Sequence, residues 1–253
     1  MLKQYLNWLL IFIGSMALGL AGSRMLSVRQ ATVRAFDGMH PKRSFVLQTT
    51  QNMFTASGTF SRSMLKTYAR FGDGTVMFSI RQTIPEAELI TMQILDPNKD
   101  TRIFVDEVTK SVTRIKPPKA VFSEMMSELS SEGCPSGVDL SKLPESEEIL
   151  GVKTRYYIDE TPAITDERWI VPDLNCLILK EIQTSHELGG AHNEMMATSI
   201  TFGEPPARLR TIPPFFAERA PKEVQSLHLA ATGHGIYGPA GLKLLSEYYW
   251  PTR

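Results

Sequence analysis

Short alternations of apolar and polar residues, separated by turn residues, run from about residue 64 to residue 202 and constrain the fold most. In residues 75–82, Val76, Phe78 and Ile80 are separated mostly by polar side chains. This period of two is typical of a strand with one buried face. The preceding Gly-Asp-Gly at 72–74 favours a hairpin turn. We predict strands at residues 64–71, 75–82, 89–95, 101–107, 112–116, 152–159, 167–171, 175–184 and 193–202.

Helical periodicity is almost absent between these strands, which fixes the expected fold class. We predict a mainly β protein: a single curved antiparallel sheet, a half-barrel of about 9–11 strands, with few short helices. Residues 117–144 interrupt the strands with a long insertion that holds a short helix at 121–129, and connections of this length are usually functional or mobile. The proline-rich residues 203–221 end the sheet, because proline cannot donate to a strand ladder.

The N-terminal residues 5–22 contain no charged side chain and follow Lys3. This layout is typical of a signal peptide or a membrane anchor, and a helix of this length would span about 27 Å. We predict an apolar helix within 1–22, a linker with a helix over 23–45, the half-barrel over 46–217 and a C-terminal tail over 218–253. Arg24, Arg29 and Arg34 favour a cytoplasmic location for the rest of the chain, whereas export places the domain in the periplasm or cell envelope. We favour export.

Charge excludes one class of partner. The chain has 27 Lys plus Arg and 27 Asp plus Glu, a formal net charge of +0. A protein that binds nucleic acid normally carries a basic surplus to neutralise phosphates. We therefore expect no nucleic-acid partner, and apolar burial becomes the expected source of binding energy.

Motifs for catalysis are not found: the sequence has no phosphate loop, HExxH, paired CxxC or Gly-x-Ser-x-Gly elbow. We expect no enzyme, no catalytic residue, no cofactor and no metal. His186 and His192 flank two glycines, but they face each other only across a three-residue loop, so exposed hairpin residues are favoured over a metal site. Acidic runs such as Asp166 with Glu167, or the glutamates in 145–148, indicate solvated faces. A hydrolase that uses Asp166, Glu167 or a histidine is the third-ranked alternative.

Cys134 and Cys176 are the only cysteines. In an oxidising compartment they would link the insertion to a strand, at a gain of about 4 kcal/mol in the chain-entropy model. A buried free thiol at Cys176, in an apolar strand, is the alternative.

Methionine is the strongest compositional bias, with 12 residues in the chain. Its flexible side chain suits an apolar surface that adapts to irregular ligands, although filling gaps in the core is the simpler alternative. A long curved sheet with few helices also needs an apolar cover. The predicted apolar lining of a core or cavity is Val76, Phe78, Ile80, Met92, Ile94, Phe104, Trp169 and Ile178.

Several segments share turn and strand patterns with a known group: RFGDGTVMFSIRQ, ILDPNKDTRIFVDEVTKSVTRI, LGVKTRYYID, ERWIVPDLNCLILKEIQT and ITFGEPPARLRTIPPFF. From about residue 60 to 216 the chain resembles the periplasmic lipoprotein-carrier superfamily, which serves outer-membrane lipoprotein localisation. The resemblance implies an antiparallel half-barrel over helices, with a hydrophobic cavity for acyl chains or lipidated segments. It carries over no individual binding residue. The insertion, the tail and the three arginines depart from the pattern.

The resulting hypothesis is an exported or membrane-tethered binding protein that holds a lipid acyl chain or a lipidated protein segment. The insertion or the proline-rich segment would act as a lid. Burial of the chain would supply about 0.8 kcal/mol per CH₂ group. The alternative is an interaction or envelope-sensor domain that binds a partner protein through its sheet face.

Overall fold

The computed structural model describes residues 43–251, apart from 85–86, 124–133, 136 and 234. The predicted signal peptide or anchor within 1–22 and the helix of the linker lie outside the described residues. Within the described ranges, no helix is long and apolar enough to cross a membrane.

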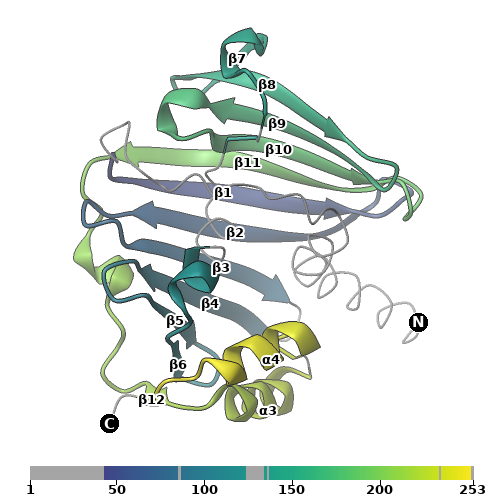
Figure 1. The fold of residues 1–253 in the computed structure, drawn as a ribbon. Helices are drawn as coiled ribbons and strands as arrows, with labels where there is room; N and C mark the ends of the chain where they lie inside the picture. Colours follow the sequence, from purple (N-terminus) through teal and green to yellow (C-terminus); the bar gives the residue numbers. More distant parts are fainter. Residues whose placement is uncertain (1–42, 85–86, 124–133, 136, 234, 252–253) are drawn as a thin grey trace.

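One large curved sheet of 12 strands forms the body of the protein (Figure 1). Its order is β12-β6-β5-β4-β3-β2-β1-β11-β10-β9-β8-β7. All neighbours pair antiparallel except β12 and β6, which are parallel. The strands are β1 Phe45–Phe54, β2 Phe60–Arg70, β3 Val76–Ile84, β4 Ala87–Asp96, β5 Thr101–Asp106, β6 Ser111–Ile115, β7 Glu145–Ile149, β8 Val152–Glu160, β9 Ile164–Val171, β10 Leu177–Ser185, β11 Ala191–Phe202 and β12 Ala217–Glu218. The predicted fold class is confirmed.

Strand β1 joins the two halves of the sheet, because it lies between β2 and β11. The sequence pattern did not predict this strand. Phe45 and Leu47 alternate as expected, but the next two residues on the same face are Thr49 and Gln51, which weakens the apolar period. The two other additional strands, β7 and β12, are a glutamate-rich edge and a two-residue parallel pair.

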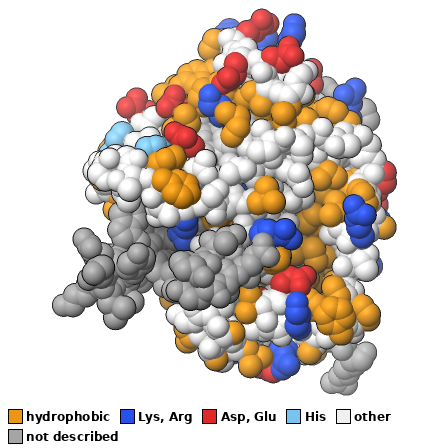
Figure 2. Space-filling view, turned by 180° about the vertical axis from the view of Figure 1, so that it is seen from behind, with side chains coloured by type: hydrophobic (Ala, Val, Ile, Leu, Met, Phe, Trp, Pro, Cys, Tyr) orange, Lys and Arg blue, Asp and Glu red, His pale blue; other side chains and the backbone are white. Residues whose placement is uncertain are grey.

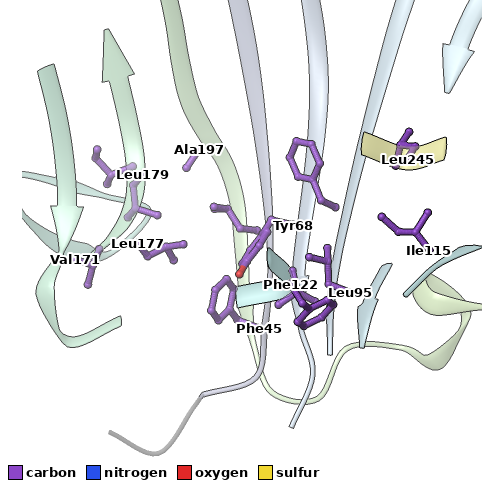
Figure 3. Packing of buried hydrophobic residues seen from close by; sticks show 14 residues of the cluster. Phe45, Tyr68, Leu95, Ile115, Phe122, Val171, Leu177, Leu179, Ala197 and Leu245 are labelled. Atoms are coloured by element: carbon purple, nitrogen blue, oxygen red, sulfur yellow. The ribbon is translucent and has the colours of Figure 1, made fainter. Parts of the chain in front are cut away.

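The inner face of the sheet is defined here as the face that carries Phe45, Tyr68 and Leu95. Their cluster includes Phe122, from the helical turn at 119–123, and Leu245, from α4 Pro239–Glu247 (Figure 3). Phe122 and Leu245 are both buried. The insertion and the C-terminal part of the chain thus close part of the inner face.

The opposite, outer face carries a second apolar cluster that includes Met77 and Ile94, against which Leu209 and Ile212 pack. These two residues belong to the proline-rich segment, around the 3-10 helix Ala207–Arg210. The guanidinium of Arg210 lies over the ring of Phe71 and forms an ion pair with Asp73. Residues 209–212 of the proline-rich segment therefore cover the outer face, so this part of the segment is not the predicted lid over the inner face.

The C-terminal residues, for which the sequence predicted no structure, form α3 Pro221–Thr232 and α4. Proline occupies the first turn of each helix, where its missing N–H costs nothing. Helix α3 buries Val224 and His228, and residue Tyr249 bridges to Ile115 of β6. This part of the chain therefore packs on the β6 end of the sheet.

The structure contains the Cys134–Cys176 disulfide, with Cα atoms 4.9 Å apart and a separation of 42 residues. Asn175 and Cys176 both have positive φ, at 56° and 55°, immediately before β10. The bond fixes the C-terminal part of the insertion to the start of β10. Of the two alternatives left open by the sequence, the structure shows the bridge.

Candidate functional site

Two methionines flank a glutamine on the inner face, at the centre of the sheet. Gln51 of β1 pairs with Met64 of β2 on one side and with Met195 of β11 on the other. Two residues further along β2, on the same face, Lys66 is opposite Ile80 of β3. We name Ile80, Met64 and Met195 the inner-face strip.

Met64 and Met195 are buried, and neither belongs to the two apolar clusters formed by the described residues. The residues next to them in sequence point the other way. Leu65 and Met196 lie on the outer face, 36% and 40% exposed. Strand alternation thus gives one methionine of the 195–196 pair to each face of the sheet.

A cluster of charged residues adjoins this strip on β9 and β10. Arg168 forms an ion pair with Asp166, and its Nε donates to Glu181 Oε1 at 3.0 Å. Glu181 is directly opposite Met195. On β8, Tyr157 is opposite Arg168 and Asp159 is opposite Asp166. We name Tyr157, Asp159, Asp166, Arg168, Glu181 and the nearby Lys66 the charged cluster.

Asp166 is the least satisfied member of the charged cluster. It is 8% exposed, and its Oδ1 atom is buried without a hydrogen-bond partner among the described residues. Burial, followed by the repulsion of Glu181, raises the pKa of Asp166 to about 6, although Arg168 acts in the opposite direction. Burial also lowers the pKa of Lys66, against the attraction of Glu181. Both shifts indicate that water does not fully solvate these charges.

A second buried aspartate, Asp106 of β5, is fully partnered. Its Oδ2 lies 3.0 Å from Nδ1 of His228 on α3 and accepts a hydrogen bond from Thr109, while Oδ1 accepts from the Val108 amide. These hydrogen bonds lower the pKa of Asp106, although burial acts against them. This pair attaches α3 to the sheet.

Six of the eight predicted lining residues divide between the two faces of the sheet, and the other two, Trp169 and Ile178, lie on β9 and β10. Val76, Phe78, Ile80 and Phe104 share the inner face, since each is opposite an inner-face neighbour. Met92 and Ile94 lie on the outer face with the second cluster. Trp169 is on the other face of β9 from Arg168 and packs against the same apolar cluster as Val76 and Phe78. Its ring lies edge-on to Tyr156, with the Lys180 ammonium 4.1 Å above it. Ile178 is half-buried, opposite Ile170.

His186 and His192, on either side of the glycine turn, contact different residues. His186 Nε2 is 2.8 Å from Thr165 Oγ1, whereas the ring of His192 stacks on Phe54 at 4.7 Å. No group of metal-ligating side chains occurs in the described ranges. The expectation that Asp166 and Glu167 share a solvated face is wrong for Asp166, because alternation turns it inward while Glu167 accepts a hydrogen bond from Tyr156.

Two surface hollows of the described residues are small and partly polar. The larger, about 470 Å³, is lined by residues of β7, β8 and the loop before β10, including Glu145, Lys153 and Asp173. On the surface seen from behind, hydrophobic and charged side chains are interspersed (Figure 2). Neither hollow contains the inner-face strip.

No family model matches the chain, and no curated protein matches it. Among solved structures, PNGF-II is similar over 70% of this chain at 11% identity and a TM-score of 0.38, but the chain spans only 31% of that protein. A conserved protein from Thermus thermophilus matches over 69% of this chain and 89% of its own, at 8% identity and a TM-score of 0.41. A LolA superfamily protein from Nitrosomonas europaea matches over 68% and 91%, at 9% identity and a TM-score of 0.33.

A LolA superfamily protein is thus among the solved structures that this chain weakly resembles. These values transfer no activity or ligand to this chain. We derive the function from the geometry of the inner face instead.

Proposed function

We propose that this protein is a non-enzymatic, extracytoplasmic binding protein that holds an apolar chain against the inner face of its sheet. The observation that carries the proposal is the inner-face strip. Met64 and Met195 flank Gln51 across β1, outside both apolar clusters of the described residues. Methionine side chains adapt to apolar ligands of irregular shape. The ligand class is a lipid acyl chain or a lipidated segment.

The insertion at 117–144 is the proposed lid. Phe122 packs into the inner-face core, and the Cys134–Cys176 bond ties the same insertion to β10. Met64 and Met195 are buried in this structure, so binding of a ligand to them requires the side chains packed over them to move.

Location outside the cytoplasm is supported by the disulfide, because such bonds persist in oxidising compartments and are rare in the cytosol. The uncharged residues 5–22 support export or tethering in the same way. Alkaline phosphatase fused after Arg253 of the full chain tests the location. An active reporter is expected, and an inactive reporter would contradict an extracytoplasmic domain.

Extraction of lipids from the purified chain, followed by mass spectrometry, tests the binding proposal. We expect a co-purifying acyl species in the wild-type protein and in Met196→Gln, which changes only the outer face. Met195→Gln places an amide in the strip and should reduce the bound species about fivefold or more, because a buried amide loses its hydrogen bonds to water. Equal occupancy in the two variants, each shown to be folded by its thermal transition, would contradict the proposed site.

A further inference from the structure

We propose that the charged cluster is a head-group site for an ammonium group carried on the apolar chain of the ligand. This inference rests on the proposed function, because the apolar part of the same ligand would occupy the inner-face strip. The ligand class is then an amphiphile with a protonated amine, and the neighbouring strands bind its two ends.

The unpartnered oxygen of Asp166 identifies the kind of group that is missing. Arg168 occupies Oδ2, and Glu181 accepts a hydrogen bond from the Asp166 carboxyl when Asp166 is protonated; in the ionised form Oδ1 is buried and receives no hydrogen bond from the described residues. Buried carboxylate oxygens are almost always hydrogen-bonded, so an unfilled acceptor is an exception that needs a donor. A donor from outside the chain would complete the site.

The balance of charge indicates that this donor is a cation. Asp166 and Glu181 are balanced by Arg168 and Lys66, and the solvent-exposed Asp159 of β8 adds a third carboxylate on the same face of the sheet. One added positive charge neutralises the set and fills Oδ1 with a charge-assisted hydrogen bond. A carboxylate or phosphate without an amine would instead add a fourth negative group, which like-charge repulsion disfavours.

The position of the charged cluster fits a ligand with an apolar tail. Glu181 is directly opposite Met195, so the polar site and the inner-face strip are contiguous across β10 and β11. The side chains of Arg168 and Glu181 remain 32% and 25% exposed, which leaves this side of the cluster accessible to solvent. Because Oδ1 itself is covered, the amine displaces neighbouring side-chain atoms when it binds.

Binding of three probes with the same twelve-carbon chain, measured by calorimetry on the full chain at pH 7.5, tests the inference. The probes are dodecylammonium, dodecanol and dodecanoate. We expect dodecylammonium to bind about tenfold more tightly than dodecanol, and dodecanoate to bind most weakly. Asp166→Asn should remove most of the preference for the amine and leave dodecanol unchanged. Glu160→Gln, an exposed carboxylate on the other face of β8, is the matched control and should keep the preference.

The wild-type protein provides a second readout that requires no variant. Because burial and Glu181 raise the pKa of Asp166 to about 6, the preference for dodecylammonium should decline as the pH falls from 7.5 to 5. Arg168 stays charged over this range, and Tyr157, Asp159, Glu181 and Lys66 are the other titratable groups that face the site. A preference that stays constant over this range would overturn the role of Asp166.

The outcomes separate this inference from the proposed function. If the three probes bind equally, or dodecanoate binds best, the ammonium site is wrong and the apolar site stands. If none binds, both are wrong. Competition by phosphatidylethanolamine vesicles would identify a lipid amine as the source. Competition by an acylated peptide with a free amine, and not by its acetylated form, would identify a peptide amine. Either result supports the ammonium site.

Discussion

The two ends of the inner face handle buried charge in opposite ways. At the β6 end, Asp106 is covered by α3 and every oxygen of its carboxylate is hydrogen-bonded, so its pKa is lowered. At the β9 end, Asp166 keeps an unpartnered oxygen among the described residues and its pKa is raised to about 6. A complete network stabilises the fold, whereas an incomplete one costs stability and marks a candidate functional site. We infer that the first end is structural and the second binds the ligand.

The largest expected effect on stability follows removal of the Cys134–Cys176 disulfide, which ties the insertion to the sheet near β9. Replacement of both cysteines by serine should lower the free energy of unfolding by about 4 kcal/mol, because a loop of 42 residues is released in the unfolded chain. Urea denaturation measures the loss. Hydrogen exchange should quicken in β9 and β10 before it does in β4–β6. Faster exchange at the β6 end instead would contradict the division between the two ends.

The next largest effect on stability is expected when the hydrogen bonds of Asp106 are removed. Asp106→Asn removes the charged partner of His228 and two of the acceptor sites, and it should destabilise the protein by about 3 kcal/mol. Thermal and urea unfolding of the variant give the value. A loss below about 1 kcal/mol would show that the His228 contact does not hold α3 to the sheet.

The same substitution at the other end should act in the opposite direction. Asp166→Asn removes a carboxylate whose charged form is disfavoured by burial, so at pH 7 we expect a gain of about 1–2 kcal/mol. The paired denaturation curves of the two variants are the sharpest form of the comparison. Destabilisation of both variants by the same amount would make Asp166 an ordinary structural aspartate.

The smallest effect is the pH dependence of stability. Asp166 has a folded pKa above its ordinary value of 3.8, so its protonation favours the folded state and it should add about 1 kcal/mol as the pH falls from 7 to 5. Asp106 has a lowered folded pKa, so its stabilisation persists through this window and is lost only as the pH falls below 3.8. Subtraction of the Asp166→Asn curve from the wild-type curve isolates the first effect. A flat difference between pH 7 and 5 would refute the raised pKa.

Much of the sheet could be predicted from the sequence, because its strands are regular and its turns carry glycine, aspartate and asparagine. Eight of the later predicted strands overlap β3–β6 and β8–β11, and the first overlaps β2. Alternation does not show which of the two sets of side chains in a strand lies on the inner face of the sheet. Met92 and Val76 both look apolar in sequence, but the β3–β4 register places Met92 opposite Ser79 and turns it outward.

The candidate site was less predictable for a related reason. Asp166 and Glu167 look like one acidic run, yet a strand separates them onto opposite faces, and only the pairing with Gln183 and Asp159 shows which one is buried. The network of Asp106 with His228 joins residues 122 positions apart. No local pattern reports such a contact, and the same applies to the packing of Leu245 in the core.

Photolabelling with an alkyl diazirine probe tests the central claim, that the inner face binds the apolar chain, most directly. The full chain is irradiated with the probe at a concentration near its dissociation constant, digested, and mapped by mass spectrometry. We expect labels on β2 and β11 at Met64 and Met195, with competition by unlabelled dodecylammonium. Labels concentrated at Met196, or on the outer-face segment around Leu209 and Ile212, would contradict the account.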